Sequence, residues 1–364
     1  MADDTGLDLL VLEGDGIGPE ICAATVLVLK QADAAFGLGL TFSHAPIGFS
    51  ALRQSGTTFP ESTWDQARQA HGIVLGPVSH NDYPPRAEGG LNPSGELRIR
   101  LDLYANIRPA RTHTALPHAS RQPFDLVIVR ENTEGFYADR SMHLGPGEFM
   151  PTPDLALATR KVTRHASLRI ARQAFQLART RRGKVTAVHK ANVMRVSDGL
   201  FLDCTRQVAA ENPDITYEEQ LVDAMAALLV RDASPFDVIV TTNMFGDILS
   251  DEAAELAGGL GLGASLNAGT DRAVAQAQHG SAPTLAGQDR GNPSALIFSA
   301  AMLLTWLAER HARPSLHEAA ERIEAALQAC LASPATRTPD LGGTLGTSAF
   351  AAAVAARLTA KATP

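Results

Sequence analysis

The chain has 364 residues, of which 45% are hydrophobic and 20% are charged, and its formal net charge is −7 at pH 7. This length is enough for a sizeable core and two lobes, as in an ordinary soluble globular protein. The acidic balance gives no reason to expect nucleic acid as a partner, and no apolar run approaches the roughly 20 residues that a membrane span needs.

The cysteines and the N-terminal segment indicate the compartment. Cys22, Cys204 and Cys330 are few, far apart and odd in number, which favours reduced thiols over a disulfide framework. The segment "MADDTGLDLLVLEGDG" has acids where a signal peptide needs bases, and its apolar run is short. We therefore expect a cytoplasmic protein.

Short apolar runs alternate with helix-length segments along the chain. The strand-like runs are 7–12, 72–76, 124–130, 184–190 and 236–243. The helical patterns are 20–33, 158–180 and 220–230. This alternation predicts an α/β fold with a largely parallel or mixed sheet. The Gly/Pro-rich loops at 76–95 and 258–293 are long enough to border a cleft.

Arginines gather in an otherwise half-apolar stretch and at the end of a later strand. They are Arg98, Arg100, Arg108 and Arg130. Guanidinium groups bind carboxylates in a bidentate manner, so arginines from different elements could clamp a dicarboxylate. The alternative, which is commoner for a single arginine, is a solvated charge or an ordinary ion pair.

Tyr137 and Lys190 are candidates for proton transfer. Lys190 follows the strand-like run "VTAVH", and a lysine at a strand end in a partly desolvated site can have a lowered pKa and act as a base. Tyr137 is one of only four tyrosines and could donate a proton. The alternatives are a snorkelling surface lysine and a core tyrosine whose hydroxyl is already bonded.

A pair of aspartates is a candidate metal site. Asp247 and Asp251 lie four residues apart in "FGDILSDEAAEL", hence on one face of a helix. Like charges at that spacing are mildly destabilising, and a hard cation bound by carboxylates and substrate oxygens would compensate them. The alternative is a solvated acidic helix start that the helix dipole favours. Asp223, in "QLVDAM", carries no signal of its own.

Two Gly-rich segments are candidates for contacts with a cofactor. The segment 279–297, "HGSAPTLAGQDRGNPSALI", ends where a helix begins and could present backbone N–H groups to phosphates. The segment "GDGIGPE" has glycines at 14, 16 and 18, a spacing that is not the G-x-G-x-x-G fingerprint. Singly, all of these signals are ambiguous.

Together and in this order, the motifs resemble those of the β-decarboxylating dehydrogenase family, which includes isocitrate, 3-isopropylmalate, homoisocitrate and tartrate dehydrogenases. The matching segments are "GDGIGPE", "LRIRLDLYANIRP", "VRENTEGFY", "HKANVM", "VDAMA", "TTNMFGDILSDEAAEL", "HGSAPTLAGQDRGNP" and "TPDLGGTLGT". The resemblance implies a two-lobed isocitrate/isopropylmalate dehydrogenase-like α/β fold, not an ordinary Rossmann fold. It assigns 1–103 plus 257–364 to a first, cofactor-side lobe and 104–256 to a second lobe for dimerisation and catalysis.

The resemblance also implies a reaction and a binding site. The reaction is metal- and NAD-dependent oxidative decarboxylation of a 3-substituted malate, from a 2-hydroxy acid to a 2-oxo acid plus CO₂. The residues that match the substrate-carboxylate arginines are Arg98, Arg108 and Arg130. The residues that match the ligands of Mg²⁺ or Mn²⁺ are Asp223, Asp247 and Asp251. Arg100 stands at a variable position and is expected to be structural.

The resemblance makes Lys190 the acceptor of the hydroxyl proton and Tyr137 the residue that returns a proton to carbon. In the family, the lysine and the aspartate that correspond to Lys190 and Asp223 come from the neighbouring subunit. We therefore expect a homodimer whose two active sites are shared across the interface. The Pro- and Gly-containing region 139–160 is expected to form an arm at the dimer contact, as a loop or β-ribbon.

The cofactor is expected to be NAD. The residues that match its binding site are His279, Gly280, Ser281, Ala282, Pro283, Thr284 and Asn292. NAD-specific members usually carry an acid directly after "HGSAP", where this chain has Thr284. NADP-specific bacterial isocitrate dehydrogenases carry Lys-Tyr at this point, where this chain has "TL". They also carry a Tyr and an Arg later in the chain, and the corresponding segment here, "PDLGG", contains neither. Arg290 is the only nearby candidate for a 2′-phosphate, so we favour NAD.

The 3-substituent is read by the segment before Arg98. Isocitrate dehydrogenases place Ser and Asn six and four residues before this arginine, and this chain has the pair exchanged, as Asn92 and Ser94. Isopropylmalate enzymes tend to place apolar residues there. The pair favours a polar or small substituent, as in isocitrate, tartrate or malate. Apolar Leu91 and a reshaped loop leave 3-isopropylmalate, and hence leucine biosynthesis, as the alternative.

A different class of function is a non-catalytic regulatory subunit, which some multisubunit isocitrate dehydrogenases contain. Such subunits usually lose the metal ligands or the base. Here the lysine, the tyrosine and all three aspartates are in place, so this alternative is remote.

Overall fold

The computed structural model describes residues 6–137, 142, 145 and 147–359. No helix among these residues is both long enough and apolar enough to span a lipid bilayer. The strands are β1 (Leu7–Leu12), β2 (Leu40–His44), β3 (Gly72–Leu75), β4 (Ala105–Arg111), β5 (Asp125–Glu131), β6 (Glu148–Thr152), β7 (Leu155–Ala158), β8 (Lys184–His189), β9 (Thr216–Leu221), β10 (Val238–Thr241), β11 (Leu266–Ala268) and β12 (Ala273–Gln276). The helices are α1 (Gly18–Phe36), α2 (Gly48–Ser55), α3 (Glu61–Ala67), α4 (Pro93–Arg100), α5 (Arg164–Arg179), α6 (Ser197–Glu211), α7 (Val222–Arg231), α8 (Asn243–Ala257), α9 (Ser294–His311), α10 (Pro314–Ala332) and α11 (Thr347–Thr359).

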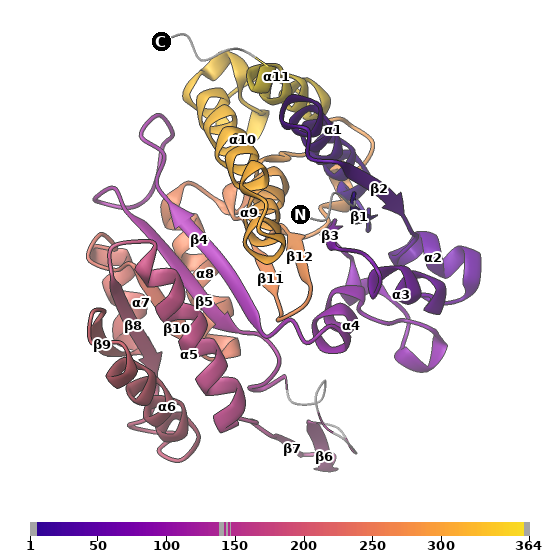
Figure 1. Cartoon of the computed structure of the whole chain (residues 1–364). Coiled ribbons are helices and arrows are strands. Elements are labelled where there is room, and N and C mark those ends of the chain that lie inside the picture. Colours follow the sequence, from indigo (N-terminus) through magenta and orange to yellow (C-terminus); the bar gives the residue numbers. More distant parts are fainter. Residues whose placement is uncertain (1–5, 138–141, 143–144, 146, 360–364) are drawn as a thin grey trace.

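One mixed sheet runs through the molecule in the order β2-β1-β3-β12-β11-β4-β5-β10-β8-β9 (Figure 1). The pairs β12–β11, β11–β4 and β4–β5 at its centre are antiparallel, whereas the flanking pairs are parallel. The predicted α/β fold with a mixed sheet is therefore confirmed. Strands β2 to β11 in this order come from the two ends of the chain, and β4 to β9 come from its middle. The lobes 1–103 plus 257–364 and 104–256 remain a proposal, and the names first lobe and second lobe are used below for these two proposed parts of the chain.

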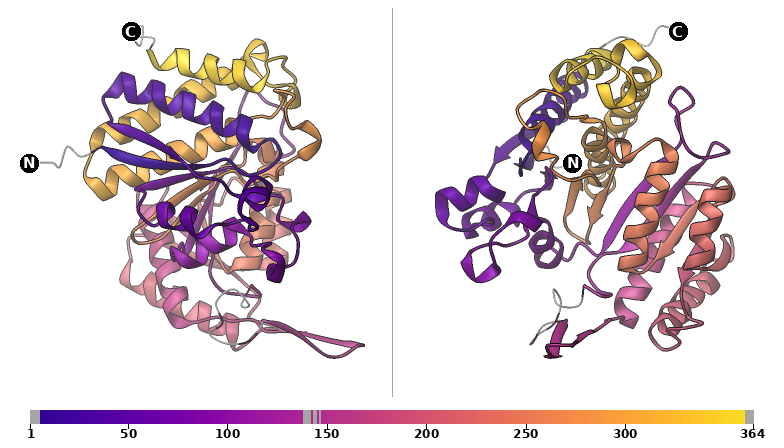
Figure 2. Two further views of the ribbon diagram at one scale, coloured as in Figure 1. Left: turned by 90° about the vertical axis from the view of Figure 1, so that its right-hand side faces the viewer. Right: turned by 180° about the vertical axis from the view of Figure 1, so that it is seen from behind.

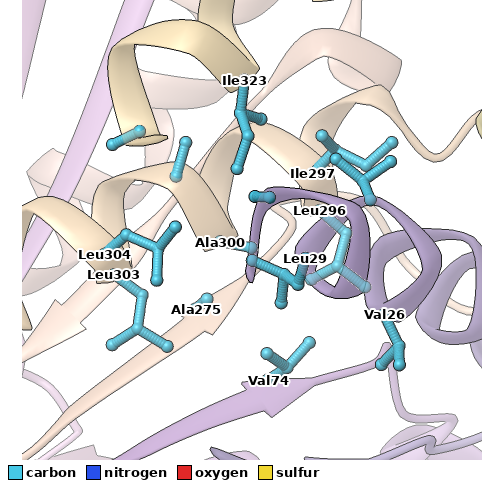
Figure 3. Packing of buried hydrophobic residues seen from close by; sticks show 14 of the residues in the cluster. Val26, Leu29, Val74, Ala275, Leu296, Ile297, Ala300, Leu303, Leu304 and Ile323 are labelled. Carbon is cyan, nitrogen blue, oxygen red and sulfur yellow. The ribbon is translucent and has the colours of Figure 1, made fainter. Parts of the chain in front are cut away.

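Strands β1 and β3 of the first lobe are buried along almost their whole length because helices cover both faces of the sheet there. In β1, Leu9 and Val11 belong to a buried cluster with α1, α9, α10 and α11. Leu10 and Leu12 point to the opposite face and pack with α2, α3 and α4. Figure 3 shows the first cluster, in which Leu29 of α1 lies against α9.

The same alternation in the second lobe directs two arginines to one side. In β5, one set of alternate side chains packs on α5 and α6, while Leu126 and Ile128 face α7 and α8. Arg130 continues this second row because side chains alternate along a strand. Arg108 of β4 is the register partner of Ile128 and so lies on the same face. The sheet thus presents both arginines toward α8.

Strands β6 and β7 form a separate antiparallel ribbon that projects from the second lobe (Figure 2). Every residue of both strands is exposed, and four of them are large and apolar: Phe149, Met150, Leu155 and Leu157. The ribbon lies in the predicted arm 139–160, of which residues 139–141, 143, 144 and 146 lie outside the described residues. Its role at a dimer contact remains a prediction.

Leu29→Ala should lower the free energy of unfolding by about 3 kcal/mol, because it removes buried methyl groups and leaves a cavity between α1 and α9. Leu29 is 1% exposed, whereas Leu27 on the same helix is 44% exposed. Leu27→Ala is therefore a matched control and should change this free energy by less than about 1 kcal/mol. Urea denaturation followed by circular dichroism measures both variants, and equal effects would contradict this packing.

Candidate active site

A cavity of about 250 Å³ opens between α4, the strands β4 and β5, helix α8 and the segment at the end of β12. It gathers the three predicted carboxylate arginines, one predicted metal ligand, the predicted tyrosine and the predicted substituent-reading pair. The described residues that line it are Val78, His80, Asn92, Ser94, Gly95, Arg98, Arg108, Arg130, Tyr137, Asp247, Ser265, Gln276, Ala277, Gln278, His279 and Gly280.

Three separate elements direct the arginines into this cavity. Arg98 comes from α4, which begins after the N-cap Asn92 with a proline in its first turn. Arg108 and Arg130 come from the neighbouring strands β4 and β5 and are only 6% and 3% exposed. Arg100 points elsewhere, since its guanidinium is paired with two glutamates and lies over an indole ring. Those contacts fit the structural role expected for Arg100.

Asp247 supplies a negative charge that Arg108 and Arg130 share. Its Oδ1 accepts a hydrogen bond from Nη1 of each arginine, at 3.2 Å for Arg108. Tyr137 Oη donates to Oδ2 of the same carboxylate at 3.3 Å, and its ring centre lies 5.9 Å from the Arg130 guanidinium. Arg108 Nη1 also donates to Ser250 Oγ at 2.7 Å. These contacts hold both guanidinium groups and the phenol around one carboxylate.

The mutual contacts shift the pKa values of the cluster. Burial would raise the pKa of Asp247, but the charges of Arg130, Arg108 and Arg98 outweigh it and lower this pKa below its ordinary value. Burial, followed by repulsion from Arg108, lowers the pKa of Arg130 to about 10, so its guanidinium stays charged at neutral pH. Burial raises the pKa of Asp251 above its ordinary value, against the attraction of Arg108. The cavity therefore keeps fixed positive charge at neutral pH.

Asp247 and Asp251 stand one turn apart on α8 and could hold a divalent cation. Arg108 Nη1 lies 3.2 Å and 3.4 Å from their carboxylates, whose side chains are 36% and 51% exposed. Across the described part of the chain, no three His, Cys, Asp or Glu side chains gather closely enough to hold a metal. Two carboxylates suit Mg²⁺ or Mn²⁺, which prefer oxygen ligands, but a full shell needs further oxygens. The donor chemistry fits such a cation, and the single chain supplies only part of the set.

Lys190 and Asp223 do not line the cavity and instead pair with each other. Lys190 Nζ lies 2.5 Å from Asp223 Oδ1, and the side chains are 24% and 66% exposed. This hydrogen bond lowers the pKa of Asp223. The backbone N–H of Lys190 donates to the buried Asp198, whose carboxylate is ion-paired with Arg160. The end of β8 is thus held firmly while the lysine and aspartate side chains are presented at the surface.

Asn92 and Ser94 reach the cavity wall from the start of α4. Asn92 Oδ1 caps the helix by accepting a backbone N–H of the first turn at 3.2 Å. Ser94 Oγ donates to Gln276 Oε1 at 3.0 Å. Three further lining residues were not identified from the sequence: Gln276 at the end of β12, Gln278 just after it, and His80 after β3. Their position just after apolar strand-like runs is the one signal that could have identified them.

A second cavity of about 250 Å³ adjoins the first at His279 and Gly280. The described residues that line it are Ile17, Gly261, His279, Gly280, Ala282, Leu285, Arg290, Gly291, Asn292 and Asp340. Of the predicted cofactor residues, those outside this lining are Ser281, Pro283 and Thr284. Burial lowers the pKa of His279, so its imidazole is neutral at pH 7.

Asp340 is a lining residue of the second cavity that was not selected as a site residue from the sequence. In the sequence, "PDLGG" signals only the lack of the tyrosine and arginine that would bind a 2′-phosphate. In the structure, Asp340 Oδ2 accepts a hydrogen bond from Asn292 Nδ2 at 2.9 Å. The cavity wall therefore contains a carboxylate held in place by Asn292, together with the cationic Arg290.

Known proteins resemble this chain over nearly its whole length. The family model described as "Isocitrate/isopropylmalate dehydrogenase" matches residues 8–354. A protein named 3-isopropylmalate/3-methylmalate dehydrogenase, from Methanocaldococcus jannaschii, is 41% identical over 355 residues, which cover 96% of this chain and 98% of that protein. An isocitrate/homoisocitrate dehydrogenase from Thermus thermophilus is 42% identical over 348 residues, covering 95% and 97%. The crystal structure of isocitrate dehydrogenase from Methylococcus capsulatus matches with a TM-score of 0.85 at 39% identity, covering 97% of this chain and 99% of that chain.

The substrate names of these relatives differ, so the comparisons establish the kind of enzyme and leave its substrate open. The match in sequence and in fold extends over both lobes and over the segments that line the two cavities. The chain therefore belongs to the isocitrate/isopropylmalate dehydrogenase family and is a β-decarboxylating dehydrogenase, in a family that generally uses NAD(P) and Mg²⁺ or Mn²⁺.

Proposed function

We propose that the enzyme uses NAD and a divalent cation to oxidise and decarboxylate a malate that has a polar or small 3-substituent. The observation that carries this proposal is the lining of the first cavity, where arginines from three elements meet Asp247 and a set of uncharged polar side chains. Arginines bind carboxylates in a bidentate manner, so the arginine side of the cavity suits the two carboxylates of the malate core.

The remaining wall favours a polar substituent over an isopropyl group. Among the described lining residues, only Val78 and Ala277 have aliphatic side chains. Ser94 and Gln276 contribute a hydroxyl and an amide to the same wall. Leu91 packs against a buried core cluster and is not part of the lining. An isopropyl group against this wall would exclude water from its polar side chains, and each hydrogen-bonding atom left unpaired would cost about 1–3 kcal/mol.

The residues of the chain take defined roles in this reaction. When bound, the cation supplies a Lewis acid, and NAD accepts the hydride from C2 of the substrate. Lys190, delivered from a second chain, accepts the proton of the substrate hydroxyl. The carbon–carbon bond to the β-carboxylate then breaks, CO₂ leaves, and Tyr137 returns a proton to that carbon. The substrate hydroxyl thus loses one proton to Lys190, and the carbon that lost CO₂ gains one from Tyr137. The arginines hold the carboxylates of the bound substrate in place.

A homodimer would bring the missing groups to each cavity. Lys190 and Asp223 are paired at the surface of this chain, and among the described residues that line its own cavity the one carboxylate is Asp247 and there is no lysine. Next to Lys190, Val193 and Val196 are 68% and 88% exposed, and Ile248 on α8 is 59% exposed. Exposed apolar side chains of this kind, with those of the β6–β7 ribbon, are typical of an interface.

NAD suits the second cavity better than NADP. The carboxylate of Asp340 would repel a 2′-phosphate, whereas it can accept hydrogen bonds from ribose hydroxyls. Arg290 is the only cationic side chain among the described lining residues, since the buried His279 is neutral. A cytoplasmic location remains part of the proposal, supported by three buried cysteines that form no disulfide.

Oxidation of 3-isopropylmalate in leucine biosynthesis is the second candidate, because the relative from Methanocaldococcus jannaschii carries 3-isopropylmalate in its name. That name also includes 3-methylmalate, whose substituent is small. The remote alternative is a regulatory subunit without activity, which the retained lysine, tyrosine and aspartates argue against.

Rates of NADH formation with isocitrate, tartrate, D-malate and 3-isopropylmalate, in the presence of Mg²⁺ or Mn²⁺, test the substrate class. We expect the highest kcat/KM for a polar or small substituent, and no activity after removal of the cation with EDTA.

Ser94→Ala should lower the kcat/KM for the preferred substrate about tenfold by removing a hydroxyl from the cavity wall. Ser120→Ala, at a buried serine outside both cavities, should have no effect. Fastest turnover of 3-isopropylmalate would contradict the proposed substrate.

Complementation tests the shared sites. Lys190→Ala and Asp247→Asn should each abolish activity, but co-expressed chains should regain about one quarter of it, because half of the random dimers carry one intact site. Lys184→Ala, at the other end of β8, is the matched control and should stay active. Inactive co-expressed chains that form dimers would show that Lys190 and Asp247 act within one chain.

Asp340→Asn tests the cofactor preference, because it removes the charge and keeps an oxygen that can bond Asn292. The ratio of kcat/KM for NAD to that for NADP should fall about tenfold as the repulsion of the 2′-phosphate is lost. Asp271→Asn removes an exposed carboxylate that is paired with Arg310 and is not part of the cavity lining, and it should leave the ratio unchanged. An unchanged ratio in Asp340→Asn would rule out this role.

A further inference from the structure

Two serines that lie 202 residues apart in the chain meet between the two cavities. Ser79 Oγ and Ser281 Oγ are 2.8 Å from each other, and the residues are only 9% and 8% exposed. Neither serine lines either cavity. Their hydroxyls therefore bond each other and are not presented to a ligand.

Each serine lies between two residues that do line a cavity. The neighbours of Ser79 in the first cavity are Val78 and His80. The neighbours of Ser281 in the second cavity are Gly280 and Ala282. A contact between the two hydroxyls thus joins a segment of the substrate wall directly to a segment of the cofactor wall.

Both serine segments are attached to the loop that precedes α1. The buried carboxylate of Asp15 accepts the backbone N–H of Ser79 at 3.0 Å, and the N–H of Ile17 donates to the Ser281 carbonyl at 2.8 Å. Between them, Gly16 has φ = 59°, and a Cβ there would lie 1.9 Å from that carbonyl oxygen. Only glycine fits this position. The loop before α1 is therefore packed closely against both the Ser79 segment and the Ser281 segment.

We propose that Ser79 and Ser281 are positioning residues that couple substrate binding to cofactor binding, an inference that rests on the proposed function. Separation of the two segments would leave two buried hydroxyls without partners, which is unfavourable. A substrate that orders Val78 and His80 therefore also stabilises the cofactor wall beside Ser281. By linkage, the cofactor has the same effect on the substrate wall.

NADH titrations with and without D-malate plus Mg²⁺ measure this coupling. Reduced cofactor cannot oxidise D-malate, so the ternary complex does not turn over, and NADH fluorescence reports binding. The dissociation constant of NADH should fall about fivefold in native protein when D-malate and Mg²⁺ are present. Ser79→Ala and Ser281→Ala should each reduce this ratio to below about twofold, and the double variant should reduce it no further, because both remove the same contact.

Two control variants separate coupling from general damage. Ser79→Thr keeps a hydroxyl and should retain the coupling, and Ser120→Ala removes a buried serine hydroxyl outside both cavities and should leave it intact. An unchanged ratio in the alanine variants, or the absence of coupling in native protein that binds both ligands, overturns this inference alone. Native protein that fails to bind NADH or D-malate, measured by isothermal titration, overturns the proposed function instead.

Discussion

Two arginine side chains buried on adjacent antiparallel strands repel each other, and the rest of the site depends on how that repulsion is balanced. Without a counter-charge, burying Arg108 and Arg130 together would cost several kcal/mol. Asp247 balances them from α8 and also accepts the Tyr137 hydroxyl. In the proposed reaction, a substrate carboxylate replaces Asp247 as the ion-pair partner of both arginines, so that Asp247 can bind a cation. The same carboxylate thus serves the stability of the free chain and the chemistry of the complex.

The central antiparallel strands explain why the cavity lies where the lobes meet. Strands β11 and β12 belong to the first lobe, and β4 and β5 belong to the second, yet all four are hydrogen-bonded neighbours in one sheet. Arg108 in the middle of β4, Arg130 near the end of β5 and Gln276 at the end of β12 therefore converge without any long loop having to carry them there. The Ser79–Ser281 contact joins the two cavity walls in addition, so the walls are connected by side chains as well as by the sheet.

The alternating apolar runs and the arginine-containing motifs were predictable because their signals are local. That Arg108 and Arg130 lie on one face was not predictable, because it depends on the register between β4 and β5. Asp340 was not predictable, because its place in the second cavity depends on a contact with Asn292 from a distant segment. Leu91 was ambiguous for the same reason, since only the packing beneath α4 decides that it faces the core. The role of Lys190 follows from the family resemblance, because its surroundings in the single chain show only a surface ion pair.

The first lobe combines both ends of the chain, and this has a consequence for synthesis. Strand β3 pairs with β12, and α1 packs against α11, the last helix of the described chain. At about 5–20 residues per second, a ribosome needs on the order of 10–40 seconds to make the roughly 200 residues between β3 and β12. During that time one face of β1 and β3 is covered by α2, α3 and α4, but the opposite face and α1 lack α9, α10 and α11. All strands of the proposed second lobe are made before β12, so its part of the sheet can form while the N-terminal core still lacks β12 and the helices that follow it.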